Sequence, residues 1–334
     1  MSFIHQKDLT GKTHWDENKS LAELLQKMGD SLKNFKPDHL DTELIERGEE
    51  IIRFGKTTAP SGKSSKYISK YYNCVSCHNS EIEDPDLKKS DPEVRLAFAN
   101  SENIPFLQAS TFYGMVNRES WYNGDYIKKY GDLVIEANKD ITAAVQLCAV
   151  ECSQGRKVED WEMDAIMAYL WSLEYRLGDL GLQESDFKKL NEEYEDKANH
   201  DALIKWIKSF YLQASPATFA DPPESRKGGF EQLVGNPKNG QLIFEKSCLH
   251  CHDENGVTKY TLEDNKLSFK KLKKDMAKSS QLSLYHAIRY GTKPEPGHKP
   301  YMPQYTLERM SNQQIEDFRA YVEVMAKGEE MNGK

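Results

Sequence analysis

The sequence predicts a mostly α-helical protein with two domains. Alternating apolar and polar runs, which are typical of strands, are sparse along its 334 residues. Two separate segments end in similar amphipathic helical patterns, and each segment contains the same short cysteine motif. Because a chain of this length suits two domains of ordinary size, we interpret the repeat as two domains joined by a linker.

The repeat is clearest in the two closing segments, residues 159–175 and 311–326. Both open with acidic or polar residues and continue with apolar residues at helical spacing, and both contain an Ala-Tyr pair. Far upstream of each, a helical pattern runs up to the cysteines, at residues 43–55 and 239–252. Each unit is therefore predicted to consist of a helix, a cysteine motif, a long loop and a closing helix.

This pattern divides the chain into four parts. We predict an N-terminal extension at residues 1–40, a first domain at 41–180, a linker at 181–225 and a second domain at 226–334. The extension carries one amphipathic helix near residues 20–32, and the first domain carries an insertion rich in Lys, Ser and Tyr at 56–72. The linker is first very polar and then rich in Pro and Gly, which predicts an irregular crossing.

Composition excludes some classes of protein. The apolar fraction is 38%, the charged fraction is 29%, and no run approaches the roughly 20 apolar residues that span a bilayer, so we expect no integral membrane segment. The net charge of −8 gives no sign of a nucleic-acid partner. One basic run stands out, and we interpret it as a solvated face: Lys270, Lys271, Lys273 and Lys274.

The two cysteine motifs both read C-x-x-C-H. Two thiols at this spacing add to the two vinyl groups of one porphyrin, and the adjacent histidine binds the iron. A redox C-x-x-C pair or half of a zinc site is the alternative for a single motif, but the repeat favours haem. We predict two covalently bound haem c groups, attached at Cys74, Cys77, Cys248 and Cys251, with His78 and His252 as iron ligands.

The second iron needs a sixth ligand, and Met302 is our candidate. It precedes a proline in the loop before the closing helix, which resembles the methionine loop of class I cytochromes c. A thioether ligand raises the potential and leaves no open site, so this haem is predicted to transfer electrons. Met310, which we interpret as packing, and His298 are the alternatives.

The first segment has no matching methionine. Superposing the two Ala-Tyr pairs places Val150 opposite Met302, and Cys148 and Cys152 flank it. We therefore predict a thiolate ligand to the first iron, with Cys148 preferred over Cys152. The alternatives are that both cysteines are small buried apolar residues, that they form a disulfide, or that Met115 or a histidine elsewhere is the ligand.

Residues 146–171 resemble a segment of the dihaem thiosulfate dehydrogenases and, more loosely, of the A subunit of the sulfur-oxidising SoxAX cytochromes. In those families a cysteine in a short helix is followed by a glycine, a basic residue and the closing Ala-Tyr helix, which matches Cys148, Gly155, Arg156 and Ala168-Tyr169 here. The resemblance covers about a third of the chain and implies two class I cytochrome c-like domains. It also implies that Cys148 is the axial thiolate of a catalytic haem, although Glu151 stands where the family usually has arginine.

The resemblance further implies a sulfur-compound oxidoreductase that couples thiosulfate to tetrathionate, or the reverse, at the first haem and passes electrons through the second. Cationic side chains suit such dianionic substrates, and we name Arg118, Arg156 and Lys157 as candidates. The rival interpretation is a non-enzymatic dihaem electron carrier. A dihaem peroxidase is a third interpretation, which the predicted sulfur ligands disfavour.

Two further expectations concern partners and location. We expect a redox partner protein, such as another cytochrome, and a small anionic sulfur substrate. The first twenty residues lack the charged and apolar regions of a secretory signal. Because the families that this chain resembles attach haem outside the bacterial cytoplasm, we expect a periplasmic or otherwise exported protein whose native signal is not in this sequence.

Overall fold

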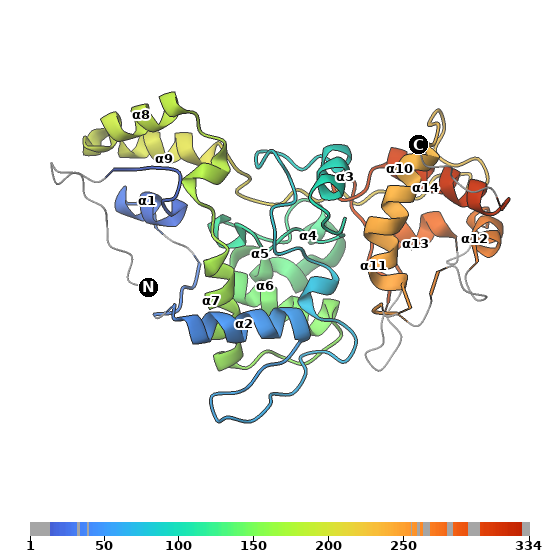
Figure 1. The fold of residues 1–334 in the computed structure, drawn as a ribbon, viewed down its shortest axis with the longest axis horizontal. Helices are drawn as coiled ribbons and strands as arrows, with labels where there is room; N and C mark the ends of the chain where they lie inside the picture. Colours follow the sequence, from blue (N-terminus) through green and yellow to red (C-terminus); the bar gives the residue numbers. More distant parts are fainter. Residues whose placement is uncertain are drawn as a thin grey trace.

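The structure is a computed structural model that describes residues 14–31, 34–38, 40–254, 256–258, 261–262, 268–278, 283–292 and 301–328. The predicted mostly α-helical class is confirmed, because the described residues form helices and isolated β-bridges, with no strand among them. None of the described helices is long and apolar enough to cross a membrane. Helices pack into three lobes, with the lobe of α1, α8 and α9 and the lobe of α10 to α14 at opposite ends (Figure 1).

The first hydrophobic core is built around helices α2 (Thr42–Phe54) and α7 (Asp160–Ser172), which cross each other. The crossing is close because α2 places Gly48 against the backbone of α7. A Cβ on Gly48 would lie 1.9 Å from the carbonyl oxygen of Ala165 and 2.8 Å from the Cβ of Tyr169. Only glycine therefore allows the two helices to approach this closely.

The second hydrophobic core repeats this crossing with helices α10 (Pro237–Ile243) and α14 (Asn312–Met325). A Cβ on Gly240 would lie 2.1 Å from the carbonyl oxygen of Asp317 and 2.7 Å from the Cβ of Tyr321. Both glycines meet the Cβ of the tyrosine in the Ala-Tyr pair and the carbonyl oxygen of the residue four positions before it. The internal repeat inferred from the sequence thus corresponds to a repeated helix crossing.

The observed helices agree with the predicted closing segments, since α7 covers 160–172 of 159–175 and α14 covers 312–325 of 311–326. Ser311 caps α14 by accepting a hydrogen bond from the Gln314 amide. The remaining described elements of the first lobe are η1 (Cys74–Ser76), η2 (Met115–Asn117), α4 (Tyr126–Tyr130), η3 (Gly131–Val134), α5 (Ile135–Lys139), α6 (Ile141–Leu147) and η4 (Cys148–Cys152). Those of the second lobe are η7 (Phe244–Cys248), α11 (Leu249–His252), α12 (Phe269–Met276) and α13 (Leu284–Tyr290).

A third, smaller core joins the N-terminal extension to the linker. Helix α1 (Leu21–Lys27) packs against the segment of η5 (Leu177–Leu180), α8 (Glu184–Tyr194), η6 (Lys197–Asn199) and α9 (His200–Lys208). Trp15, Leu24 and Leu203 are each 1% exposed or less within it. No described helix lies between Lys208 and Pro237, where the sequence predicts an irregular crossing.

Helix α3 (Pro92–Ser101) comes from the sequence of the predicted first domain, but it packs in the second core. Leu96, Ala99 and Phe106 belong to the same buried cluster as Phe244 and Phe318. Capped by Asp91 and opened by Pro92, the helix lies between the two lobes in Figure 1. The two lobes are therefore interleaved, although the predicted domain boundaries themselves stay a prediction.

Candidate haem sites

The first motif, Cys74 to His78, begins with a single 3₁₀ turn after Asn73. Its histidine is held in one orientation, because the Nδ1 atom of His78 lies 2.6 Å from the carbonyl oxygen of Ser110. The ring also stacks on Phe112, with 4.4 Å between ring centroids. Burial lowers the pKa of His78 to about 4, so the imidazole is neutral and Nε2 is the nitrogen left to bind a metal.

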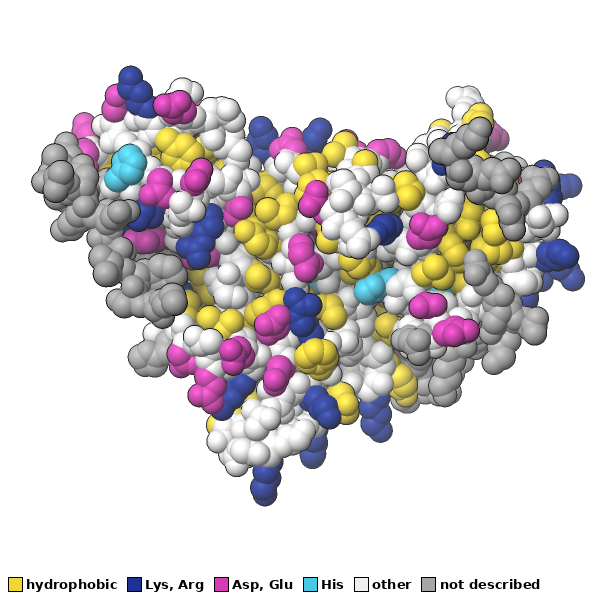
Figure 2. Space-filling view, in the orientation of Figure 1, with side chains coloured by type: hydrophobic (Ala, Val, Ile, Leu, Met, Phe, Trp, Pro, Cys, Tyr) yellow, Lys and Arg dark blue, Asp and Glu magenta, His cyan; other side chains and the backbone are white. Residues whose placement is uncertain are grey.

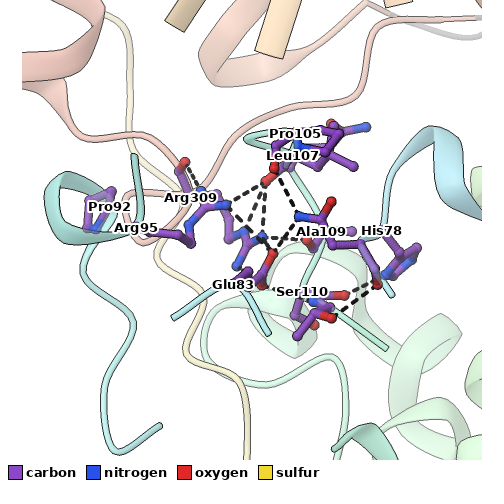
Figure 3. A network of polar contacts seen from close by, with 12 residues as sticks. His78, Glu83, Pro92, Arg95, Pro105, Leu107, Ala109, Ser110 and Arg309 are labelled. Atoms are coloured by element: carbon purple, nitrogen blue, oxygen red, sulfur yellow. Dashed lines mark hydrogen bonds and ion pairs between the residues drawn. The ribbon is translucent and has the colours of Figure 1, made fainter. Parts of the chain in front are cut away.

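The segment that carries Ser110 is fixed by a buried network (Figure 3). Glu83 accepts a hydrogen bond from the Thr111 amide at 2.9 Å and forms a two-pronged ion pair with Arg309, at 2.7 and 2.8 Å. The same guanidinium donates to the carbonyl oxygens of Leu107 and Ala109. The neighbouring Arg309 holds the pKa of Glu83 at about 2 against the opposing effect of burial.

The second motif, Cys248 to His252, closes a continuous helical run from Pro237 that includes a π-helical turn at Phe244–Cys248. It abuts the first motif. His250 Nε2 lies 3.0 Å from the carbonyl oxygen of Val75, and Cys251 Sγ lies 3.9 Å from that of Ser76. The structure therefore places the two motif segments in direct contact, which no pattern in the sequence indicated.

Met302 lies at the edge of the second core, where it is partly buried. Its amide donates to the Thr292 hydroxyl at 2.7 Å, and the Thr292 amide donates to its carbonyl oxygen at 2.9 Å. Met310 is 2% exposed and its carbonyl oxygen accepts from Arg289, which fits the interpretation that it packs. His298 lies outside the described residues. Met302 as a sixth ligand stays a prediction.

Cys148 and Cys152 lie on one π-helical turn, Cys148–Cys152. Such turns are common at functional sites. Both thiols are free, so the alternative of a disulfide is not the arrangement in this structure. The Tyr122 hydroxyl lies 3.9 Å from Cys152 Sγ. Burial and the nearby thiols of Cys152 and Cys148 raise the pKa of Tyr122, so the two cysteines face a neutral phenol in an apolar site.

Which of the two cysteines binds a metal stays a prediction. A hydrogen bond with Cys152, together with burial, raises the pKa of the Cys148 thiol. The same bond lowers the pKa of Cys152. Met115, the other alternative, is 7% exposed within the first core.

The candidate cationic residues are not gathered around the two cysteines. Arg118 is 8% exposed and donates to the Ser110 hydroxyl at 3.1 Å and to the Ser215 hydroxyl. Since the Ser110 carbonyl oxygen is the partner of His78, Arg118 lies on the His78 side of the first motif. Its role as a substrate ligand stays a prediction.

Arg156 is engaged with the insertion and with α7. It forms a two-pronged ion pair with the buried Glu162, at 2.7 Å for both contacts, and donates to the carbonyl oxygens of Lys66, Tyr67 and Lys157. These contacts use all five N–H donors of the guanidinium. Lys157 is exposed and is the one of the three candidates with its charge at the surface. The catalytic roles of Arg156 and Lys157 stay predictions.

The residues around the first motif suit a haem in one further respect. Trp121 is 6% exposed within the first core, and its buried Nε1 has no hydrogen-bond partner among the described residues. A buried donor of this kind requires an acceptor, and a haem propionate would supply one.

Comparison with known proteins agrees with the second motif. Residues 237–326 match the family model of cytochrome c. These residues are a cytochrome c domain. The matched range begins at the first residue of α10 and ends just after α14, so it contains the second motif, Met302 and the glycine crossing. No curated protein and no solved structure matches the chain significantly.

Several consequences follow from the cytochrome c domain. A cytochrome c domain implies covalently bound haem c with iron and electron transfer to a redox partner. Cys248, Cys251 and His252 as the residues that hold this haem stay a prediction. In Figure 2 hydrophobic side chains gather at the surface of this lobe. Sequence reasoning did not predict the contacts of Tyr72, Glu83 or Arg309, because a local motif carries no information about contacts between distant segments.

Proposed function

We propose that this protein is a dihaem c-type cytochrome, in which the lobe around α2 and α7 is a second cytochrome c-like domain. The observation that carries this proposal is the repeated helix crossing, in which Gly48 meets Tyr169 as Gly240 meets Tyr321. The C-x-x-C-H motif of the first lobe and the orientation of His78 by Ser110 support the same function. The insertion of residues 56–72 makes the path from Gly48 to Cys74 longer than the path from Gly240 to Cys248.

A bound haem supplies an iron that gains and loses single electrons. The protein's contribution is to hold the two attachment segments against each other. The His250 to Val75 contact and the Cys251 to Ser76 contact join the two motifs at their intervening residues. This contact gives electrons a short path between the two lobes.

We further propose that the first site acts on small anionic sulfur compounds. Joining two thiosulfate dianions forms one S–S bond in tetrathionate and releases two electrons, which leave one at a time through the second domain to the redox partner. The free thiols of Cys148 and Cys152 on their π-helical turn support this, since a soft sulfur ligand suits sulfur substrates. Among the candidate cations, Lys157 is the one exposed to an incoming dianion.

A non-enzymatic dihaem electron carrier is the second candidate function. One observation favours it. All five N–H groups of Arg156 are already bonded, and Arg118 is buried beside Ser110, the residue that bonds to His78. An enzyme for dianions needs cationic groups at the reacting centre. In this arrangement neither guanidinium presents donors beside Cys148 or Cys152.

Electron paramagnetic resonance of the oxidised protein tests both candidates. The native protein is compared with Cys148→Gly and Cys152→Gly, and the haem content of each is measured. A low-spin thiolate signal that disappears in one variant, together with reduction of the native protein by thiosulfate, supports the enzyme. Two haems with signals that neither variant changes, and no reduction by thiosulfate, leave the electron carrier. A single haem per chain contradicts the dihaem proposal itself.

We also propose that the protein works in the periplasm or another exported compartment. The covalent attachment of haem c at Cys248 and Cys251 supports this, because the attachment machinery of the resembled families acts outside the bacterial cytoplasm. Fractionation of cells that make the full-length native protein tests the proposal, with haem staining to follow the mature form.

A further inference from the structure

We propose that Arg309, a residue of the cytochrome c domain, is a positioning residue for the iron ligand of the other lobe, His78. The inference rests on the proposed dihaem function. It goes beyond that function because it links the axial ligation of one haem to a side chain that belongs to the domain of the other.

Arg309 is almost entirely buried, with 6% of its surface exposed, and it reaches out of its own lobe. Its Nη1 and Nη2 atoms bind the two carboxylate oxygens of Glu83 at 2.7 and 2.8 Å. Nε and Nη2 donate to the carbonyl oxygen of Leu107 at 3.3 and 3.0 Å, and Nη2 also donates to that of Ala109. Every one of these partners comes from residues 83–109, in the predicted first domain.

The contacts of this ion pair fall on both sides of Ser110, the residue that orients His78. On one side Arg309 holds the carbonyl oxygen of Ala109. On the other side Glu83, held by Arg309, accepts from the Thr111 amide at 2.9 Å. The Thr111 amide and the Ser110 carbonyl belong to one planar peptide group, and the Ala109 carbonyl belongs to the preceding one. The direction of the Ser110 carbonyl, and with it the hydrogen bond to His78, is therefore fixed through both peptide groups (Figure 3).

Arg309 is itself fixed in the segment that leads from Met302 to α14. Its amide donates to the Thr306 carbonyl oxygen at 3.1 Å, and its carbonyl oxygen accepts from the buried Arg95 of α3. The Tyr305 amide is bonded to the Ile288 carbonyl oxygen at 2.8 Å. A shift of this segment in the second lobe is thus transmitted as a shift of the guanidinium in the first.

The chemical consequence is an effect on reduction potential. A histidine ligand that donates Nδ1–H to a well-placed carbonyl oxygen carries more negative charge on its ring and stabilises the oxidised iron. Strengthening this bond lowers the potential, and loosening it raises the potential. By fixing Ser110, Arg309 keeps the potential of the first haem low.

The test is a redox titration of the holoprotein in which electron paramagnetic resonance follows the ferric signal of each haem separately. Arg309→Met removes the guanidinium and keeps an unbranched side chain. Arg289→Met is the matched control, because Arg289 is also buried and is anchored in the same segment. It donates to the carbonyl oxygens of Tyr305 and Met310 and to the side chain of Asn312, all of which lie in the second lobe. We expect the potential of the first haem to rise in Arg309→Met and to stay at its native value in Arg289→Met.

An unchanged potential in Arg309→Met, or the same rise in both variants, overturns the inference. If Arg309→Met does not fold, Glu83→Gln is titrated instead. This variant keeps the shape of the side chain and weakens its bond to Arg309. An unchanged potential of the first haem in Glu83→Gln would equally overturn the inference. Failure of the dihaem proposal is distinguishable, since the native protein would then contain one haem and show one potential.

Discussion

The hydroxyl group of Tyr72 is bonded to both backbone groups of Tyr301. It accepts a hydrogen bond from the Tyr301 amide at 2.7 Å and donates one to the Tyr301 carbonyl oxygen. The two rings also meet edge to face, with 6.1 Å between centroids. Tyr72 lies two residues before Cys74 and Tyr301 lies directly before Met302, so one phenol ties the start of the first motif to the predicted ligand loop of the second domain.

Replacing this phenol is expected to loosen the Met302 segment. Tyr72→Phe leaves the Tyr301 amide and carbonyl groups without their partner, which costs about 1–3 kcal/mol of unfolding free energy. We also expect a weaker charge-transfer band from methionine-ligated ferric haem, because Met302 follows the freed residue. Denaturant unfolding and the visible spectrum measure the two effects. The half-buried Tyr71 provides the control, and an equal loss in Tyr71→Phe would contradict this prediction.

Replacing either glycine at the helix crossings with alanine is expected to destabilise the protein. In an exposed helix interior, Gly→Ala stabilises by about 1 kcal/mol. Here the added Cβ would meet a backbone oxygen at 1.9 Å for Gly48 and at 2.1 Å for Gly240, so we expect Gly48→Ala and Gly240→Ala to destabilise by about 2 kcal/mol or more. Chemical denaturation of the holoprotein measures this change.

Substitutions at exposed positions of the same two helices are the controls for the glycine variants. Glu46→Ala in α2 and Lys238→Ala in α10 leave the crossings intact and are expected to change stability by less than about 0.5 kcal/mol. A stabilised Gly48→Ala variant would show that the two helices are not packed as described.

Removing either Arg309 or Glu83 from their ion pair is expected to lower the free energy of unfolding strongly. Removing one partner of a buried pair costs about 3–5 kcal/mol, because the other charge stays buried with less compensation. Without Arg309, the Glu83 carboxylate keeps the more distant guanidinium of Arg95, at 3.8 Å. We expect Arg309→Met to fall in this range and Glu83→Gln with Arg309→Met to recover part of the loss. A double-mutant cycle, with unfolding in urea, measures the coupling free energy between the two side chains. Purely additive losses of stability would contradict this prediction.

Asp84 is expected to make stability fall as the pH rises. Burial, and next the neighbouring Glu83, raise the pKa of Asp84 to about 6 from its ordinary 3.8. The folded protein then binds the proton more tightly than the unfolded chain, so the penalty is absent below about pH 4 and complete above about pH 6. Asp84→Asn removes it and is expected to be more stable than the native protein at neutral pH by an amount on the order of 1 kcal/mol.

Unfolding midpoints measured across this pH range test the Asp84 prediction. The exposed Asp164 serves as the control, and Asp164→Asn is expected to leave the pH profile unchanged. If Asp84→Asn lost stability at neutral pH relative to the native protein, the carboxylate would have to be a stabilising partner rather than a buried charge.

Local sequence signals predicted the parts of the fold that depend on a single segment. The closing helices α7 and α14 were found within a few residues because an amphipathic pattern and a polar cap both act over one helix. The third core was not found, because the apolar residues of α1 and of α8 and α9 lie far apart in the sequence. The sequence also assigned α3 to the first domain, whereas its apolar face is buried in the second core.

The candidate site likewise has one part that local sequence predicted and another that it did not. The cysteine spacing, together with the repeat of the motif, predicted the haem of residues 237–326, because two thioether bonds and one ligand must come from a short stretch of chain. By contrast, Arg309 and Glu83 are separated by 226 positions, and His250 and Val75 by 175. Their contacts follow from burial, since a charge or polar group enclosed away from water must meet whichever partner the fold brings to it. The chain thus determined its attachment motifs by local chemistry, and tertiary packing decided how each lobe contacts the segment that carries the other lobe's predicted ligand.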